Sequence, residues 1–238
     1  MKPKTALQQD LLRRATLERT GFMGPLFGSD EFFRARFFIE KMESYIESSE
    51  AAEVTELETR TVALSDDEKQ DFWSWNYPIH WEDIFGTRIR SALCIQICSH
   101  VEAVLGDVAH RVKVIERCGA PKRPDGGSML DKHLTFLTTK ANFGQPSALQ
   151  WEKMGYISKI RNIFVHSQGH NNKYSEDLQF TQFLSNLPHV GLEHDFIELK
   201  AGSCSAILEI AEQFCNSLRD EYEAYRKRAL ALEHTSEN

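Results

Sequence analysis

Apolar residues recur every three or four positions along most of this chain, which is the spacing of an amphipathic helix. The clearest stripe lies in residues 81–118 and consists of eight side chains: Ile89, Leu93, Ile97, Val101, Leu105, Val108, Val112 and Ile115. The same spacing predicts further helices over residues 5–19, 29–49, 129–140, 147–169 and 203–230. A chain with this pattern is predicted to be all-α.

Other stretches lack the helical spacing and are predicted to connect or cap these helices. Residues 54–64 read as a linker or a short extended piece, because threonine and valine there favour strand conformation. Ser65 and Glu68 form a capping box, which predicts that a short helix begins after Ser65. Residues 119–128 are rich in glycine and proline and are predicted to be a loop.

The segment that follows residue 170 is mixed in pattern. It contains apolar residues without a clear period, then a turn at residues 188–191. Residues 196–199 predict one short extended piece. The long helix over residues 203–230 is then the last predicted element.

One predicted helix carries a strip of polar, reactive side chains at its C-terminal end. At about 100° per residue, four apolar side chains gather on one side of it: Ile157, Ile160, Ile163 and Phe164. Ser158, Asn162 and His166 are spaced four residues apart and therefore share a ridge that faces away from this apolar side. Arg161 lies at the edge between the two sides, and Gly169 is predicted to end the helix.

The string Arg161-Asn162-x-x-x-His166 resembles the R-N-x-x-x-H form of the R-x4–6-H motif of the HEPN superfamily. This superfamily comprises all-α domains and includes many prokaryotic ribonucleases of toxin–antitoxin and phage-defence systems. Its members carry the motif near the C-terminal end of a core helix, preceded by a long helix and followed by at least one more. The predicted helices follow that order, so the resemblance implies a HEPN-like helical bundle with an N-terminal helical extension.

The resemblance implies a metal-independent endoribonuclease that acts as a homodimer on RNA. Two protomers of the superfamily place their motifs against each other, which brings two arginines and two histidines into one cleft. His166 would then carry out acid–base chemistry, Arg161 would stabilise charge on the phosphorus oxygens, and Asn162 would orient the imidazole. No cofactor and no metal are expected.

Three accessory residues join these catalytic candidates. Glu102 is one, because some HEPN domains carry an acidic residue on the preceding core helix. Ser158 is the second, because it lies on the polar ridge, and His170 is the third, as a second imidazole.

Charge is distributed unevenly along the chain. The net charge is −7, which is unfavourable for nonspecific binding to nucleic acid. Residues 109–173, however, contain 11 lysines and arginines against 4 acidic residues. This segment predicts a phosphate-attracting surface around the motif, with four basic residues as candidates: Lys122, Arg123, Lys159 and Lys173.

The sequence predicts three parts. Residues 1–65 form an N-terminal helical extension and linker, residues 66–232 form the HEPN-like domain, and residues 233–238 form a frayed tail. The N-terminus lacks the apolar run of a signal peptide, which predicts a cytoplasmic protein with no membrane partner. The five cysteines contain no C-x-x-C pair and are predicted to be reduced thiols.

Two other functions remain open. A HEPN-like domain can bind RNA, a nucleotide or a protein without cutting, with Arg161 and His166 as structural groups. A metal hydrolase would use His166 and His170, which are four residues apart, but Gly169 interrupts their helix. An antitoxin or a defence protein is an expected partner, although Gln168 stands where some HEPN toxins carry a tyrosine that is a modification target.

Overall fold

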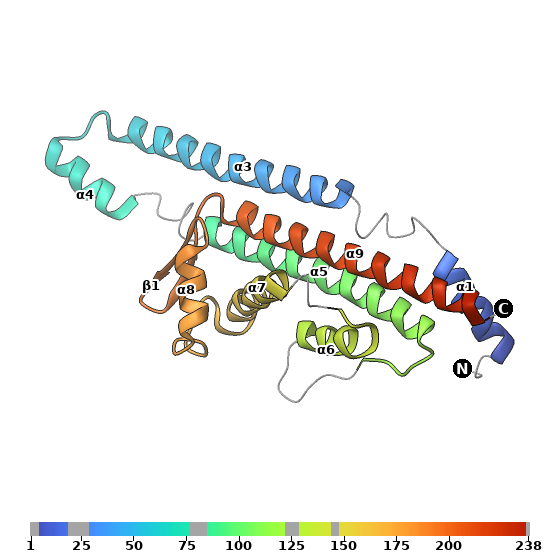
Figure 1. Cartoon of the computed structure of the whole chain (residues 1–238). Coiled ribbons are helices and arrows are strands. Elements are labelled where there is room, and N and C mark those ends of the chain that lie inside the picture. Colours follow the sequence, from blue (N-terminus) through green and yellow to red (C-terminus); the bar gives the residue numbers. More distant parts are fainter. Residues whose placement is uncertain (1–4, 19–28, 77–84, 122–128, 144–147, 237–238) are drawn as a thin grey trace. The chain divides into compact units, whose positions relative to one another are not determined.

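The computed structural model describes residues 5–18, 29–76, 85–121, 129–143 and 148–236. Over these residues the protein is all-α, as the sequence predicts, with one small two-stranded sheet. The elements in chain order are α1 (Ala6–Glu18), α3 (Ser29–Thr61), α4 (Asp66–Asn76), α5 (Thr87–Ile115), α6 (Met129–Ala141), α7 (Ala148–Ser167), α8 (Leu178–Asn186), β1 (Val190–Glu193), β2 (Phe196–Leu199) and α9 (Ser203–Ser236) (Figure 1).

The chain divides into two compact units. The first unit contains residues 1–33, 96–159 and 208–238, and the second contains residues 34–95 and 160–207. Four helices, α3, α5, α7 and α9, contribute residues to both units.

In the first unit, arginine side chains fasten helix ends by donating to carbonyl oxygens that have no partner within their own helix. Arg13 Nε of α1 donates to Ile115 O at the end of α5, at 2.9 Å. Arg226 Nη1 of α9 donates to Leu17 O near the end of α1, at 2.7 Å. Both bonds hold α1, whose residue Leu17 is fully buried, against the helices of this unit.

In the second unit, a buried arginine joins three elements. Arg90 of α5 is 1% exposed, and its Nε and Nη2 donate to the two carboxylate oxygens of Glu43 on α3 at 3.0 and 2.7 Å. Its Nη1 donates to Leu199 O, the last residue of β2, at 3.2 Å. Charge-assisted bonds of this forked kind are stronger than neutral ones, so the cluster links α3, α5 and the sheet.

The cysteines are free thiols, as the sequence predicts. Cys94 and Cys98 lie on the buried side of α5. Burial raises the pKa of the Cys204 thiol to about 12, and the protonated thiol lies 3.5 Å from Arg90 O. These cysteines therefore act as small buried side chains rather than reactive groups.

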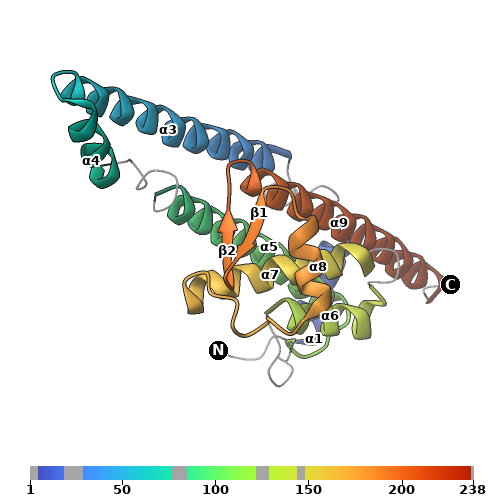
Figure 2. The same ribbon diagram turned by 90° about the vertical axis from the view of Figure 1, so that its left-hand side faces the viewer.

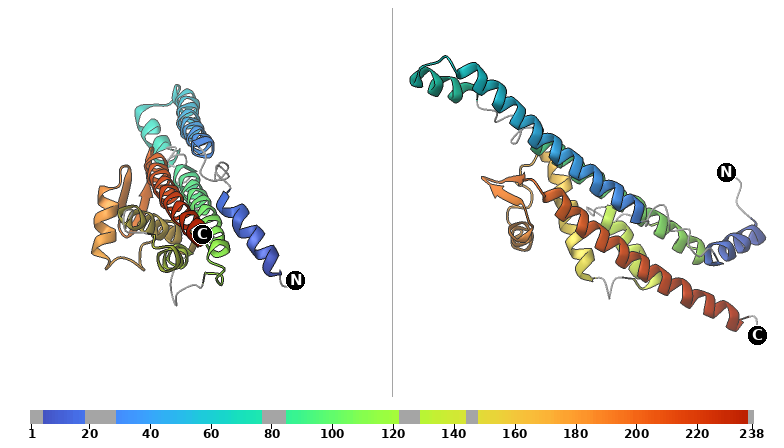
Figure 3. Two further views of the ribbon diagram at one scale, coloured as in Figure 1. Left: turned by 45° about the vertical axis from the view of Figure 1, so that its right-hand side comes forward. Right: turned by 90° about the horizontal axis from the view of Figure 1, so that it is seen from above.

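The prediction of a linker or extended piece at residues 54–64 is wrong. These residues continue α3 without a break as far as Thr61 (Figure 3). The threonines that favour strands satisfy their hydroxyls inside the helix, because Thr55 Oγ1 donates to Ala51 O at 2.8 Å and Thr59 Oγ1 to Thr55 O at 2.9 Å. Burial of Leu57 at 7% exposure adds a packing contribution that outweighs the local strand preference.

The capping box is confirmed as the start of α4. The Glu68 carboxylate accepts from Ser65 Oγ at 2.6 Å and from Ser65 N at 2.9 Å. These bonds lower the pKa of the Glu68 carboxyl, and the bond from the Ser65 hydroxyl has the largest effect.

The segment after residue 170 is more ordered than the sequence predicts. Asp177 Oδ1 accepts from Phe180 N at 3.0 Å and caps a helix, α8, that the mixed pattern did not reveal. The extended piece at residues 196–199 is confirmed as β2, but it pairs antiparallel with β1, which begins within the predicted turn. The final helix, α9, reaches Ser236 rather than ending near residue 230.

Among the described residues, α5 is the one helix long and apolar enough to cross a membrane by length and composition. Half of its most apolar window is buried inside the protein. The core helix of a soluble protein passes the same test, so this property is weak evidence for a membrane span.

Candidate functional site

The motif lies at the C-terminal end of α7, and three of the four side chains of the predicted apolar side are buried, whereas Phe164 is half-buried. Ile157 and Ile160 are fully buried, and Ile163 is 2% exposed. Asn162 is half-buried and His166 is exposed. The helical spacing therefore anchors α7 by its isoleucines and leaves the imidazole of His166 accessible to solvent.

Arg161 and Asn162 form a hydrogen-bonded pair. Arg161 Nη1 donates to Asn162 Oδ1 at 2.9 Å, so the guanidinium fixes which way the amide oxygen points. Arg161 Nε is buried and has no hydrogen-bond partner within the part of the chain that the structure describes. A buried unsatisfied donor costs free energy and is uncommon outside functional or solvated sites.

The end of α7 is built by two residues in the left-handed region. Gln168 has φ 51° and Gly169 has φ 101°. The Gly169 N–H donates to Ile163 O at 3.3 Å and satisfies one of the last carbonyls of the helix. The predicted helix stop at Gly169 is thus confirmed, and His166 lies in the last turn of α7.

A hairpin made by β1 and β2 is fastened to this helix end (Figure 2). The Ile197 N–H donates to Gly169 O at 2.9 Å, and the Asn171 N–H donates to Asp195 O at 2.6 Å. The rings of His170 and Phe196 meet edge to face with centroids 5.4 Å apart. The backbone on both sides of His170 is therefore held in place.

Two residues of this arrangement were missed in the sequence. Asn171 is fully buried, and neither atom of its side-chain amide has a hydrogen-bond partner among the described residues. Phe196 was expected only as part of an extended piece, yet it packs on His170. The sequence indicates only that Phe196 is an aromatic residue at the start of a short strand. Its contact with the end of α7 depends on the tertiary fold and cannot be read from the local sequence.

The accessory candidates lie in both units. Glu102 on α5 and Ser158 on α7 belong to the first unit and are half-buried. His170 belongs to the second unit and is exposed just beyond α7.

Two of the four basic candidates, Lys159 and Lys173, lie within the described residues. Lys159 Nζ lies 5.0 Å from the centroid of the Tyr156 ring, and Lys173 Nζ lies 5.2 Å from that of Tyr174. These contacts place the ammonium groups over aromatic faces. Lys122 and Arg123 lie outside the described residues.

No group of three or more histidine, cysteine or acidic side chains placed to hold a metal ion occurs among the described residues. The groups that are present can transfer protons and bind anions. An exposed imidazole can exchange a proton near neutral pH, and a guanidinium offers a planar fork of donors to a phosphate.

Comparison of this chain with models of protein families, with curated proteins and with solved structures finds no match.

Proposed function

We propose that this protein is a metal-independent endoribonuclease that acts as a homodimer in prokaryotic toxin–antitoxin or phage-defence systems. The observation that supports the proposal most is the joint placement of Arg161, Asn162 and His166 on the last two turns of α7. The pair Arg161–Asn162 lies at the edge of the buried face. His166 lies exposed one turn further along the same ridge as Asn162.

Cleavage of RNA without a metal requires three kinds of group. A base takes the proton of a 2′-hydroxyl, an acid protonates the departing 5′-oxygen, and a cation stabilises the charge on the phosphorus oxygens. His166 is suited to the proton transfers, and Arg161 is suited to the charge. The bond to Asn162 uses one of the five N–H donors that a guanidinium carries.

One chain supplies one arginine and one exposed histidine within the motif. Two protomers that meet at their α7 ends would bring a second copy of each residue to the same phosphodiester, so that one imidazole serves as base and the other as acid. His170 is a less suitable second imidazole, because its ring packs on Phe196.

The decisive experiment is RNA cleavage in the presence of EDTA by the wild-type protein and by His166→Ala. The wild type is expected to cut, and the variant to cut at least about 100-fold more slowly, which is the usual contribution of a general acid or base. Gel electrophoresis of a labelled mixed-sequence RNA measures both rates.

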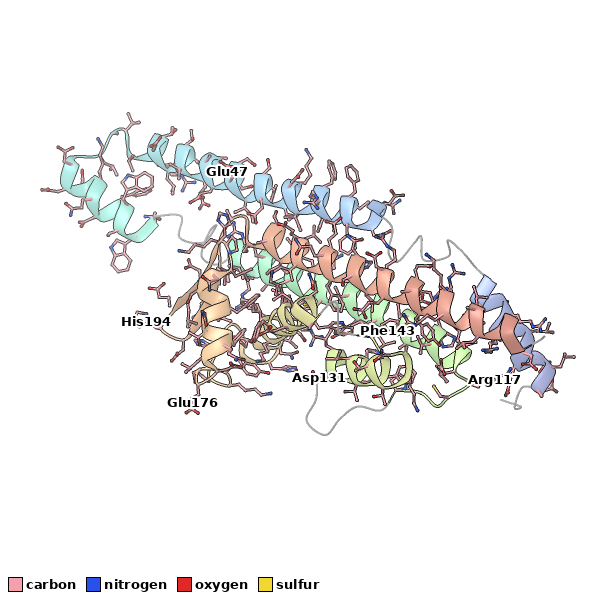
Figure 4. The ribbon with its side chains drawn as sticks, in the orientation of Figure 1. Glu47, Arg117, Asp131, Phe143, Glu176 and His194 are labelled. Atoms are coloured by element: carbon pink, nitrogen blue, oxygen red, sulfur yellow. The ribbon has the colours of Figure 1, made fainter. Side chains whose placement is uncertain are left out.

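The matched control is His194→Ala. His194 lies in the turn of the hairpin with its side chain 93% exposed (Figure 4). Its removal also deletes a solvent-exposed imidazole from the second unit, and it should leave cleavage unchanged. Absence of cleavage by the wild type, or equal cleavage by His166→Ala, contradicts the proposal.

One observation favours a second candidate, a HEPN-like module that binds RNA, a nucleotide or a protein without cutting. The bond from Arg161 to Asn162 engages part of the guanidinium within its own helix, as in a structural arginine. Under this alternative the wild type binds RNA in a filter assay but leaves it intact.

A further inference from the structure

Helix α3 buries one side and exposes aromatic rings on the other. Its buried side chains recur at intervals of seven and eleven residues: Phe32, Ile39, Ile46 and Leu57. At about 100° per residue, Phe37, Phe38 and Tyr45 lie on the opposite half of the helix. Their residues are 53%, 48% and 55% exposed.

This exposed half is called the outward face of α3, and its N-terminal part is unusual for a surface helix. Aromatic side chains lose favourable burial when they face water, and clusters of them on one surface mark interaction sites. The ammonium group of Lys41 lies 5.5 Å from the centroid of the Phe37 ring and adds a positive charge to the cluster. The N-terminal part of the face is therefore aromatic and basic.

The C-terminal part of the same face has the opposite character. Its side chains are small: Ser44, Ser48, Ala51, Ala52 and Thr55. An open hollow of about 480 Å³ lies on the flank of this part, between the outward face and the buried side, and Ala52, Ser49 and the buried Leu57 are among the residues that line it. The small, exposed side chains of the outward face themselves leave room for bulky side chains of a partner.

Charge divides the helix in the same way. Residues 34–41 contain three basic residues and one acidic residue, whereas residues 47–58 contain five glutamates, of which Glu47, Glu56 and Glu58 are exposed, and no lysine or arginine. Glu47 is labelled on α3 in Figure 4 and is one of the three exposed acids. A helix with one basic half and one acidic half complements a second copy of itself that runs antiparallel.

We infer that the outward face of α3 is a self-association surface on which α3 of a second copy lies antiparallel. Alignment of the aromatic part of one helix with the small part of the other places Phe37 opposite Ala52 and Lys41 opposite Ser48. The phenyl rings then lie against the small side chains of the partner helix, and the basic residues approach its exposed glutamates. The symmetric contact buries the aromatic rings of both copies.

This surface is independent of the proposed ribonuclease activity. The residues that carry it lie on α3, whereas the motif lies on α7. Association through α3 is measured by the mass and cross-linking of α3 variants, and cleavage by product formation. A dimer formed through α7 can cleave RNA without α3 association, and α3 association can occur without cleavage.

The first experiment compares molar mass by light scattering after size-exclusion chromatography at micromolar protein concentration. The double variant Phe37→Asp/Phe38→Asp is expected to have half the mass of the wild-type assembly, with an unchanged circular dichroism spectrum. Leu178→Asp, which alters an 82% exposed leucine on α8, is expected to keep the wild-type mass. A monomeric wild type, or a double variant of wild-type mass, overturns the inference.

The second experiment tests the antiparallel direction by oxidation of engineered cysteines. Lys41→Cys and Ser48→Cys proteins are expected to form a disulfide-linked dimer when mixed and far less when each is oxidised alone. The wild type, oxidised in parallel, measures any contribution of the native thiols. A Lys41→Cys protein that cross-links to itself more than to Ser48→Cys overturns the antiparallel arrangement.

Discussion

Replacement of Arg90 by alanine is expected to lower the free energy of unfolding by about 3–5 kcal/mol, because it leaves a buried charge without its partner. Arg90 is 1% exposed and forms forked hydrogen bonds with Glu43. Its removal leaves the Glu43 carboxylate and Leu199 O without their strongest donor. Urea denaturation followed by circular dichroism measures the loss.

The control for this prediction lies on α3, the helix that carries Glu43. Arg60 and Glu56 of α3 form an ion pair whose side chains are 62% and 64% exposed, and Arg60→Ala should cost no more than about 0.5 kcal/mol. A double variant, Arg90→Met/Glu43→Met, should lose less stability than Arg90→Ala, because it removes both charges together. Equal losses for Arg90→Ala and Arg60→Ala contradict the assigned role of the buried pair.

The Arg90 cluster also has a consequence for the motif. Arg90 donates to Leu199 O at the end of β2. Phe196, at the start of β2, packs on His170 just beyond α7. Loss of Arg90 should therefore loosen the hairpin that holds the end of α7. RNA cleavage, if present, is expected to fall in Arg90→Ala at temperatures where the variant is still folded.

Helices with a strong apolar period were predictable from the sequence, because burial of one face decides their conformation. Seven of the eight side chains in the stripe that predicts α5 are buried, with Ile89 half-buried, and the isoleucines that anchor α7 are buried as expected. Residues 54–64 were mispredicted because threonine favours strands locally, whereas a helix already begun at Ser29 continues at little cost. Helix α8 is short, and its cap at Asp177 is the one local signal that precedes it.

The candidate site was predictable only in part. Four-residue spacing places Asn162 and His166 on one ridge, and the structure keeps that spacing within α7. The bond between Arg161 and Asn162 was not predictable, because adjacent residues on a helix do not normally face each other. The contact between His170 and Phe196 joins residues far apart in the chain, and no periodicity encodes such a pair.

Substitution of Gly169 by alanine is expected to lower the free energy of unfolding by about 2–4 kcal/mol, from backbone strain and overpacking together. Gly169 has φ 101°, which side chains with a Cβ atom rarely adopt. The added Cβ would also lie against the Phe196 ring, 2.8 Å from Cζ. Thermal and urea denaturation measure the effect.

Gly155→Ala is the matched control, because Gly155 lies inside α7, the helix that ends just before Gly169, and has ordinary helical geometry. Its added Cβ would meet only Leu130 Cδ2, at 4.0 Å. This substitution should raise the free energy of unfolding by about 0.5–1 kcal/mol, since alanine favours the helix over glycine. Opposite signs for the two variants would locate the requirement for glycine at the end of α7, where the ring of Phe196 and the left-handed backbone leave no room for a side chain. A neutral Gly169→Ala would mean that the hairpin shifts readily and does not fix the position of His170.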